Sequence, residues 1–437
     1  MSQMRVKELK AEGKTVSRKA LKSGRASGTA SPAGSDVLSR VFHHEELASR
    51  SESEATPPET PPATDEELLE GQLTPDDREL PAFEPDKLIA ELQDRKANRS
   101  DTRELLIGHY IKLLRYRYNG ELEDVTTGAL VNAFLRGAQR APTPKERILS
   151  LKAYCLTAYL DNLTNIDAIR ATLKQILTDS RDEDLQIWAL RALTVTAVHY
   201  GGGEEDLFDY LDVLIEAIQS NGEKVGATGK DGVMVALFVC WAYAATFAKS
   251  LWHQADYAMD AFVEKLDSTD PDTQTVAGEC IAYIFECSRA HEEEEGEPFE
   301  MPYDPARVAS RLEELRKESN TKPRSTKQHQ ALRSVATSLE LGVGPYYTDG
   351  KSTKAYGFRL RKRNVGYSLG QSAPVESWHL YHRITLLRAI FDSGLERHIE
   401  YETDSIKAIL GDLDWEYVVK TDTQSWSRFD MGDDHYF

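Results

Sequence analysis

The chain has 437 residues, with 53 Lys and Arg against 72 Asp and Glu, and a formal net charge of −19 at pH 7. This negative mean charge excludes a protein whose whole surface binds nucleic acid, because polyphosphate would be repelled. The four cysteines form no Cys-x-x-Cys pair, which argues against a disulfide framework and fits a reducing compartment. The first 20 residues lack an apolar run, so we expect no signal peptide.

Residues 1–85 are predicted to be a disordered arm. Its first part, residues 1–25, carries eight Lys and Arg against two Glu, and residues 51–86 are acidic and rich in proline. Such segments lack the apolar area that would offset the entropy lost on ordering.

Residues 86–320 are predicted to form an array of amphipathic helices, because apolar residues recur there at helical spacing. The uncharged stretch 232–248 is close to the lower length limit of a membrane span. It has no flanking cationic cluster, so we predict a helix buried on all sides instead. Helical pairs joined by short loops favour an all-α, armadillo/HEAT-like α-solenoid, and the lack of a strict repeat leaves a non-repetitive helical domain as the alternative. The predicted helices span 103–118, 147–160, 166–177, 185–199, 207–218, 233–248, 255–266, 276–289 and 308–318.

Residues 321–411 are predicted to be a basic segment followed by a small, mostly helical C-terminal region, with helices at 377–391 and 403–410. Residues 322–363 carry ten Lys and Arg against two acidic residues, and aromatic residues are interleaved with the cations. Cations neutralise phosphates and aromatic rings stack on unpaired bases, so this composition favours RNA binding. The alternative is a solvated linker whose positive charge offsets that of the acidic helices. Residues 412–437 are predicted to form an acidic tail. The candidate RNA-binding residues are Lys322, Arg324, Lys327, Arg333, Lys351, Lys354, Tyr356, Phe358, Arg359, Arg361, Lys362 and Arg363.

Two stretches, 270–286 and 376–411, resemble conserved regions of the interferon-related developmental regulator family. The first contains the Ala-Gly-Glu-x-Ile-Ala pattern of that family, and the second contains its spaced Trp, Leu-Arg, Ser-Gly and His. The basic segment 322–341 is similar to the family's Lys/Arg-rich segment, and residues 14–20 are similar to the opening of fungal members. The matching positions with an expected structural role are Ala277, Gly278, Glu279, Trp378, Arg388, Gly394 and His398.

The resemblance implies an armadillo-like domain without catalysis and a role in the control of gene expression. Family members occur on translationally inactive ribosomes, where their C-terminal part occupies tRNA and mRNA positions, and animal members are described as transcriptional co-regulators. We therefore expect a cytoplasmic protein that binds the ribosome and its RNA. The alternative is a nuclear scaffold that binds protein partners in the solenoid groove.

No catalytic, metal or cofactor site is expected, nor a membrane or small-molecule ligand. His379 and His382 are three residues apart and His398 follows, but no Cys or carboxylate stands at a matching ligand spacing. Glycine inside a helix costs about 1 kcal/mol relative to alanine, so Gly278 indicates close approach of a neighbouring helix. We expect its neighbour Glu279 to pair with a basic residue.

Overall fold

The structure is a computed structural model that describes residues 85–94, 99–116, 124–160, 162–296, 303–319, 325–347, 357–362 and 369–419. All of these residues belong to one compact unit, Val37–Phe437. The predicted arm, apart from residue 85, and residues 420–437 of the predicted tail lie outside the described residues.

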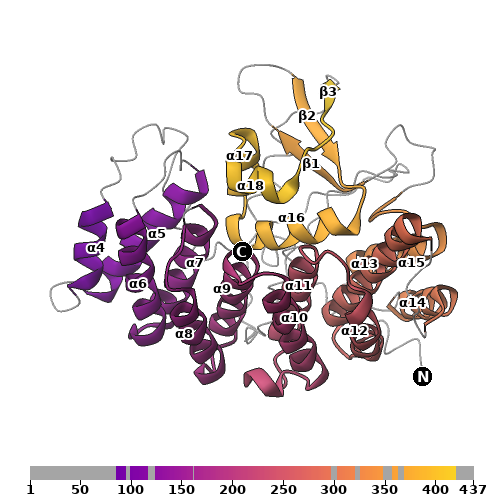
Figure 1. The fold of residues 1–437 in the computed structure, drawn as a ribbon, viewed down its shortest axis with the longest axis horizontal. Helices are drawn as coiled ribbons and strands as arrows, with labels where there is room; N and C mark the ends of the chain where they lie inside the picture. Colours follow the sequence, from indigo (N-terminus) through magenta and orange to yellow (C-terminus); the bar gives the residue numbers. More distant parts are fainter. Residues whose placement is uncertain are drawn as a thin grey trace, which may run out of the picture. The chain divides into compact units, whose positions relative to one another are not determined.

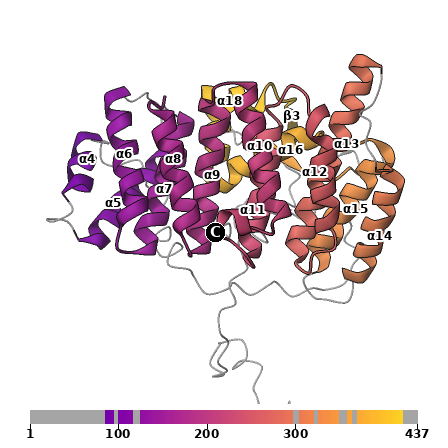
Figure 2. The same ribbon diagram turned by 60° about the horizontal axis from the view of Figure 1, so that its bottom comes forward.

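The described helices from α4 to α15 form an all-α solenoid in which helix pairs follow one another in chain order (Figures 1 and 2). From α6 onward, each even-numbered helix packs on the odd-numbered helix that follows it. The odd-numbered helices also pack on one another from α5 to α15, and we call this layer the inner row. The helices are α4 (Pro85–Gln93), α5 (Ser100–Tyr116), α6 (Asp124–Arg140), α7 (Pro144–Leu160), α8 (Ile166–Asp179), α9 (Glu183–Tyr200), α10 (Glu204–Gln219), α11 (Asp231–Ala245), α12 (Trp252–Lys265), α13 (Pro271–Glu295), α14 (Pro305–Ser319) and α15 (Ser325–Leu341).

Local sequence signals define several helix starts. The carboxylate of Asp182 accepts a hydrogen bond from the backbone N–H of Leu185 at the start of α9, with an N···O distance of 2.8 Å. Asp270 caps α13 in the same way, and the first turn of that helix begins with Pro271. These side chains satisfy backbone donors that a helix N-terminus leaves unpaired. The predicted helices from 166 to 218 therefore agree with the structure to within a few residues.

Helix α11 covers most of the uncharged stretch 232–248, whose length is close to the lower limit of a membrane span. Twelve of its 15 residues are buried, as predicted for a helix enclosed on all sides. Within the described residues, no helix has both the length and the apolar character needed to cross a bilayer.

Helices α4 and α6 were not predicted. The α6 sequence contains two threonines and two glycines, which disfavour the helical state intrinsically. Its apolar side chains at Leu130, Phe134 and Ala138 are nevertheless buried at helical spacing. Packing against α7 and α8 therefore overrides weak local propensity.

A three-stranded antiparallel sheet accompanies the helices of the C-terminal region, which was predicted to be mostly helical. Strand β1 (Arg359–Lys362) pairs with β2 (Leu369–Pro374), which pairs with β3 (Glu416–Val419). Leu360 and its register partner Ala373 are buried on one face of the sheet. Since β3 comes from residues assigned to the acidic tail, part of that tail is structured.

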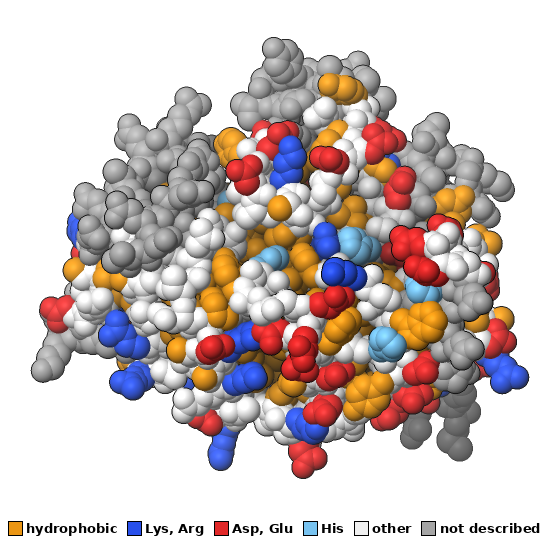
Figure 3. All heavy atoms as spheres, in the orientation of Figure 1, with side chains coloured by type: hydrophobic (Ala, Val, Ile, Leu, Met, Phe, Trp, Pro, Cys, Tyr) orange, Lys and Arg blue, Asp and Glu red, His pale blue; other side chains and the backbone are white. Residues whose placement is uncertain are grey.

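Negative charge is concentrated on the outer helix α10. Helix α10 contains six Asp and Glu residues and no Lys or Arg. Figure 3 shows acidic and hydrophobic side chains side by side over the part of the surface where Figure 1 draws α10 and α12.

Candidate functional site

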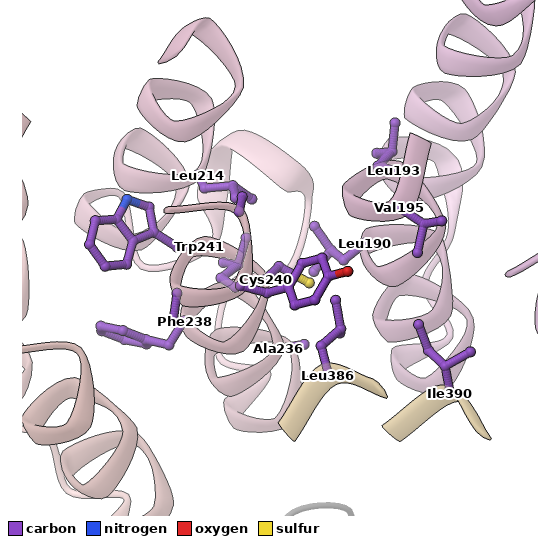
Figure 4. Close-up of a cluster of buried hydrophobic side chains, with 14 of the residues drawn as sticks. Leu190, Leu193, Val195, Leu214, Ala236, Phe238, Cys240, Trp241, Leu386 and Ile390 are labelled. Carbon is purple, nitrogen blue, oxygen red and sulfur yellow. The ribbon is translucent and has the colours of Figure 1, made fainter. Parts of the chain in front are cut away.

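The elements that follow α15 form a block that covers the inner row. This C-terminal block comprises the sheet and three helices, α16 (Trp378–Phe391), α17 (Gly394–Glu400) and α18 (Asp404–Leu410). Helix α16 packs on α7, α11 and α13, and α17 packs on α5. Leu386 and Ile390 of α16 point into the hydrophobic cluster formed by α9 and α11 (Figure 4). The groove of the solenoid is therefore occupied by the chain itself.

Glu286 of α13 caps the N-terminus of α16. Its carboxylate oxygens accept hydrogen bonds from the backbone N–H groups of Trp378 and His379, at 2.7 and 2.9 Å. Ser377 adds a cap within the block by accepting from the N–H of Leu380. Burial raises the pKa of the Glu286 carboxyl, and the two N–H groups oppose that shift by stabilising its charged form. The indole of Trp378 is fully buried beside this contact.

Glu279 also faces α16, but its hydrogen-bond partner is a tyrosine and not the basic residue that we predicted. The Tyr381 hydroxyl donates to the Glu279 carboxylate at 2.9 Å, and burial raises the pKa of that carboxyl to about 8. A Cβ at Gly278 would lie 3.4 Å from Leu312 Cδ2 and further from Val335, which is ordinary van der Waals contact. Glycine is therefore not enforced there by close helix approach, which corrects the sequence interpretation of both motif positions. Ala277 is fully buried.

Two arginines join the solenoid and the block through backbone carbonyls. Arg383 of α16 donates from Nη2 to the carbonyl of Thr246 at 2.8 Å and lies over the ring of Phe247. Arg191 of α9 donates from Nη1 to the carbonyl of Ala389 at 3.1 Å. These contacts place guanidinium groups near the C-terminal ends of α11 and α16, where the helix dipoles favour positive charge.

Helix α17 is fixed to the end of α5. His398 Nε2 contacts the carbonyl oxygen of Leu114 at 2.8 Å, and Arg115 pairs with Asp392 at 3.3 Å. A Cβ at Gly394 would lie 2.6 Å from the carbonyl oxygen of Arg115, which is closer than any real contact. Gly394 and His398, two of the predicted motif positions, therefore serve this junction, and Arg388, a third, lies over the ring of Phe358.

We expect Gly394→Ala to lower the free energy of unfolding by about 1–3 kcal/mol, because the backbone of Arg115 must move to admit the new methyl group. The matched control is Gly108→Ala in the interior of α5, where a Cβ would meet nothing within 4 Å. That control should stabilise the protein by up to ~1 kcal/mol. Urea unfolding measures both, and equal effects in the two variants would contradict the junction described above.

The structure describes the side chains of only four predicted RNA-binding residues. Arg333 is exposed on α15. Arg359 donates to Ser372 and forms an ion pair with Glu416, and only 11% of its side chain is exposed. Arg361 lies half-buried on the same face of β1. Phe358 is a core residue that packs on Tyr346 and Tyr381, so the prediction that its ring stacks on a base is wrong.

The other predicted RNA-binding residues are not described at the level of side chains. Lys327 lies in α15 and Lys362 in β1, with side chains outside the description. The remaining six lie outside the described residues altogether; these are Lys322, Arg324, Lys351, Lys354, Tyr356 and Arg363.

The histidines His379, His382 and His398 of the C-terminal block are packing residues. His379 and His382 direct Nε2 to the carbonyl oxygens of Thr246 and Glu279, at 3.1 and 3.4 Å. Burial lowers the pKa of His379 to about 4 and that of His382 to about 3, so both rings are neutral at pH 7. Across the described ranges, no three His, Cys, Asp or Glu side chains are grouped in a way that could hold a metal ion.

Sequence reasoning missed most of the docking contacts. Glu286 stands seven residues after Glu279, which places both carboxylates on one face of α13, and this spacing was the available signal. Arg191, Arg383 and Asp392 carry no local pattern, because their partners lie more than 100 residues away in sequence.

The family comparison covers the solenoid. The model of the family described as Interferon-related developmental regulator (IFRD) matches residues 53–340, which is more than half of the chain. The match includes Ala277, Gly278 and Glu279 and ends before the C-terminal block, so the resemblance of residues 376–411 stays a prediction. No curated protein matches the sequence. The chain belongs to the interferon-related developmental regulator family, a regulatory family that acts broadly on gene expression and is not known for enzymatic activity.

Proposed function

We propose that this protein is a cytoplasmic, ribosome-associated regulator that contacts ribosomal RNA through residues 322–363 and its C-terminal block. In this proposal the block occupies positions on inactive ribosomes that tRNA or mRNA would otherwise take. Inhibition would then result from occupancy and would need no chemical step.

The observation that carries the proposal is the attachment of the basic segment to a rigid block. The backbone N–H of Gly357 donates to the carbonyl of Tyr346 at 3.0 Å, so the described residues on the two sides of the connection 348–356 are hydrogen-bonded to each other. Residues 363–368 join the paired strands β1 and β2. These two connections carry Lys351, Lys354 and Arg363. A connection whose two flanking residues are fixed in a folded block loses less entropy on binding than a tail attached at one end.

The distribution of charge gives further support. The acidic outer helix α10 repels RNA, so contact there is disfavoured relative to contact through the basic segment. A net charge of −19 is therefore compatible with a single RNA-binding face and suppresses non-specific binding elsewhere.

The alternative, a nuclear scaffold with a partner in the solenoid groove, meets a physical obstacle. Helix α16 already covers the inner row, with Leu386 and Ile390 buried against α9 and α11 (Figure 4). A partner would have to bind another surface or displace α16, and exposure of these side chains would oppose displacement. The ribosome proposal requires no such rearrangement.

Ribosome co-sedimentation tests the proposal. The variant Lys351→Glu/Lys354→Glu/Lys362→Glu/Arg363→Glu should leave the ribosomal fractions, because it reverses four cations of the basic segment. Arg359 is kept, since its ion pair with Glu416 holds the sheet. For four lost phosphate contacts, the slope of log affinity against log salt should fall by about 3.

The control reverses four exposed cations on the solenoid, with Arg140→Glu, Lys145→Glu, Lys174→Glu and Arg181→Glu. It has the same total charge as the test variant and should still co-sediment. Unchanged sedimentation of the test variant would overturn the proposal. Equal release of both variants would show that only net charge matters. Partners that survive RNase treatment and include no ribosomal protein would favour the scaffold.

A further inference from the structure

The neighbouring outer helices α10 and α12 present a surface that the proposed function does not use. Its exposed acidic residues are Glu205, Asp209 and Asp212 on α10 and Asp256 on α12. Nearby carboxylates do have cationic partners: Lys249 pairs with Glu204, Arg170 with Asp206 and Lys224 with Glu216. By contrast, the four exposed acidic residues named first form no ion pair with any other described residue. We call them, with Val213, Trp252 and Tyr257, the acidic–aromatic surface.

Hydrophobic side chains are also exposed on these two helices. Val213 and Trp252 are each 45% exposed, and Tyr257 is 41% exposed. These three are close to half of the large hydrophobic residues that are exposed in the described part of the chain. Exposed aromatic residues within a polar surface are typical of protein-binding sites. Trp and Tyr rings next to carboxylates also attract cationic side chains through their faces.

A buried polar atom at this surface lacks a hydrogen-bond partner. Gln254 is 8% exposed, and its Nε2 donates to Asp212 Oδ1 at 3.1 Å and to the carbonyl of Phe208 at 3.3 Å. Its Oε1 accepts no hydrogen bond within the described structure. The amide head lies against Asp212, so this acceptor is at the base of the acidic–aromatic surface. An ammonium or guanidinium group would satisfy it.

The electrostatics of Asp212 indicate the same ligand class. Burial raises the pKa of Asp212, and the negative charges of Asp209 and Glu216 raise it further. A cation bound beside Asp212 would relieve this repulsion. RNA would be repelled by the same charges, whereas a basic protein segment would be attracted.

We propose that the acidic–aromatic surface of α10 and α12 is a docking site for a Lys- and Arg-rich segment of a partner protein. Cationic side chains of the segment pair with Asp209, Asp212 and Asp256, and one of them donates to Gln254 Oε1. The rings of Trp252 and Tyr257 contact the aliphatic stems and charged groups of the same segment. This site is independent of RNA binding by the C-terminal block.

Fluorescence anisotropy of the full chain with a labelled peptide of Lys, Arg and Gly tests the site at about 0.15 M salt. Asp209→Asn/Asp212→Asn/Asp256→Asn should weaken binding by roughly ten-fold, because three partly screened ion pairs are lost. Trp252→Ala should weaken it by about two- to five-fold through the lost cation–π contact. A Gly/Ser peptide of equal length should not bind.

The matched control is Asp167→Asn/Asp179→Asn/Glu294→Gln, which neutralises three exposed carboxylates on α8 and α13. It should retain the affinity of the unmodified protein. Equal weakening in both triple variants would assign binding to net charge and overturn the proposal. So would binding of the Gly/Ser peptide, or no binding of the basic peptide. The assay contains no RNA, so its outcome is separate from that of ribosome co-sedimentation.

Discussion

Trp378→Ala is expected to lower the free energy of unfolding by about 3–5 kcal/mol. The indole is fully buried where α16 begins, and it meets the ring of Tyr381 edge-on with centroids 5.2 Å apart. Its backbone N–H is one of the two that donate a hydrogen bond to the Glu286 carboxylate. Truncation leaves a cavity at this contact, because the capped backbone holds the surrounding residues in place.

The control for this variant is Trp252→Ala, the same substitution at a tryptophan that is 45% exposed. This substitution should lower the free energy of unfolding by less than about 1 kcal/mol. Urea unfolding followed by circular dichroism compares the two without relying on tryptophan fluorescence. Amide hydrogen exchange should also accelerate in α7 and α11 of the Trp378 variant, since α16 packs on both. A loss confined to the Trp252 variant would contradict docking of the block through Trp378.

The solenoid was largely predictable because its signals are local. Amphipathic spacing and caps such as Asp182 and Asp270 act within one or two helical turns, so a single sequence contains them. Helix α6 was missed because its threonines and glycines hide a buried face that only the neighbouring helices make favourable.

The sheet was missed for a different reason. Strand β1 has only four residues, and its alternation of Leu360 with Arg359 and Arg361 was interpreted as a cluster of charge. Strand β3, which pairs with β2, lies more than 40 residues beyond β2 along the chain. Burial of Phe358 depends on α16 and on Tyr346, so composition could not separate this core aromatic residue from a base-stacking one.

The motif residues were identified from the sequence, but their role was not. Trp378, Gly394 and His398 all lie in the junction between the block and the solenoid. Tyr381 is 102 residues from its acceptor Glu279, and no periodicity connects positions so far apart. The contacts of these residues are therefore explained by docking of α16 and α17 on the solenoid.

Glu279→Gln is expected to stabilise the protein at neutral and alkaline pH. Burial raises the pKa of the Glu279 carboxyl from 4.5 to about 8. Between these values the folded state retains a proton that the unfolded chain has lost, so stability falls as the pH rises. Removing the charge should therefore raise the free energy of unfolding by about 1–3 kcal/mol at pH 7, after the cost of an imperfectly bonded amide. Near pH 4.5 the gain should vanish.

Four ionisable groups close to Glu279 have pKa values outside this window. Burial raises the pKa values of Cys280, Tyr346 and Tyr381 and lowers that of His382 to about 3. Urea unfolding from pH 5 to 9 measures the difference from the unmodified protein, with Glu292→Gln as the control on an exposed position of α13. The free energy of unfolding of this control should stay within about 0.5 kcal/mol of that of the unmodified protein at every pH. A Glu279 variant that is less stable at pH 7 would mean that the carboxylate is already charged in the folded state at that pH, and that a positive group compensates it inside the junction.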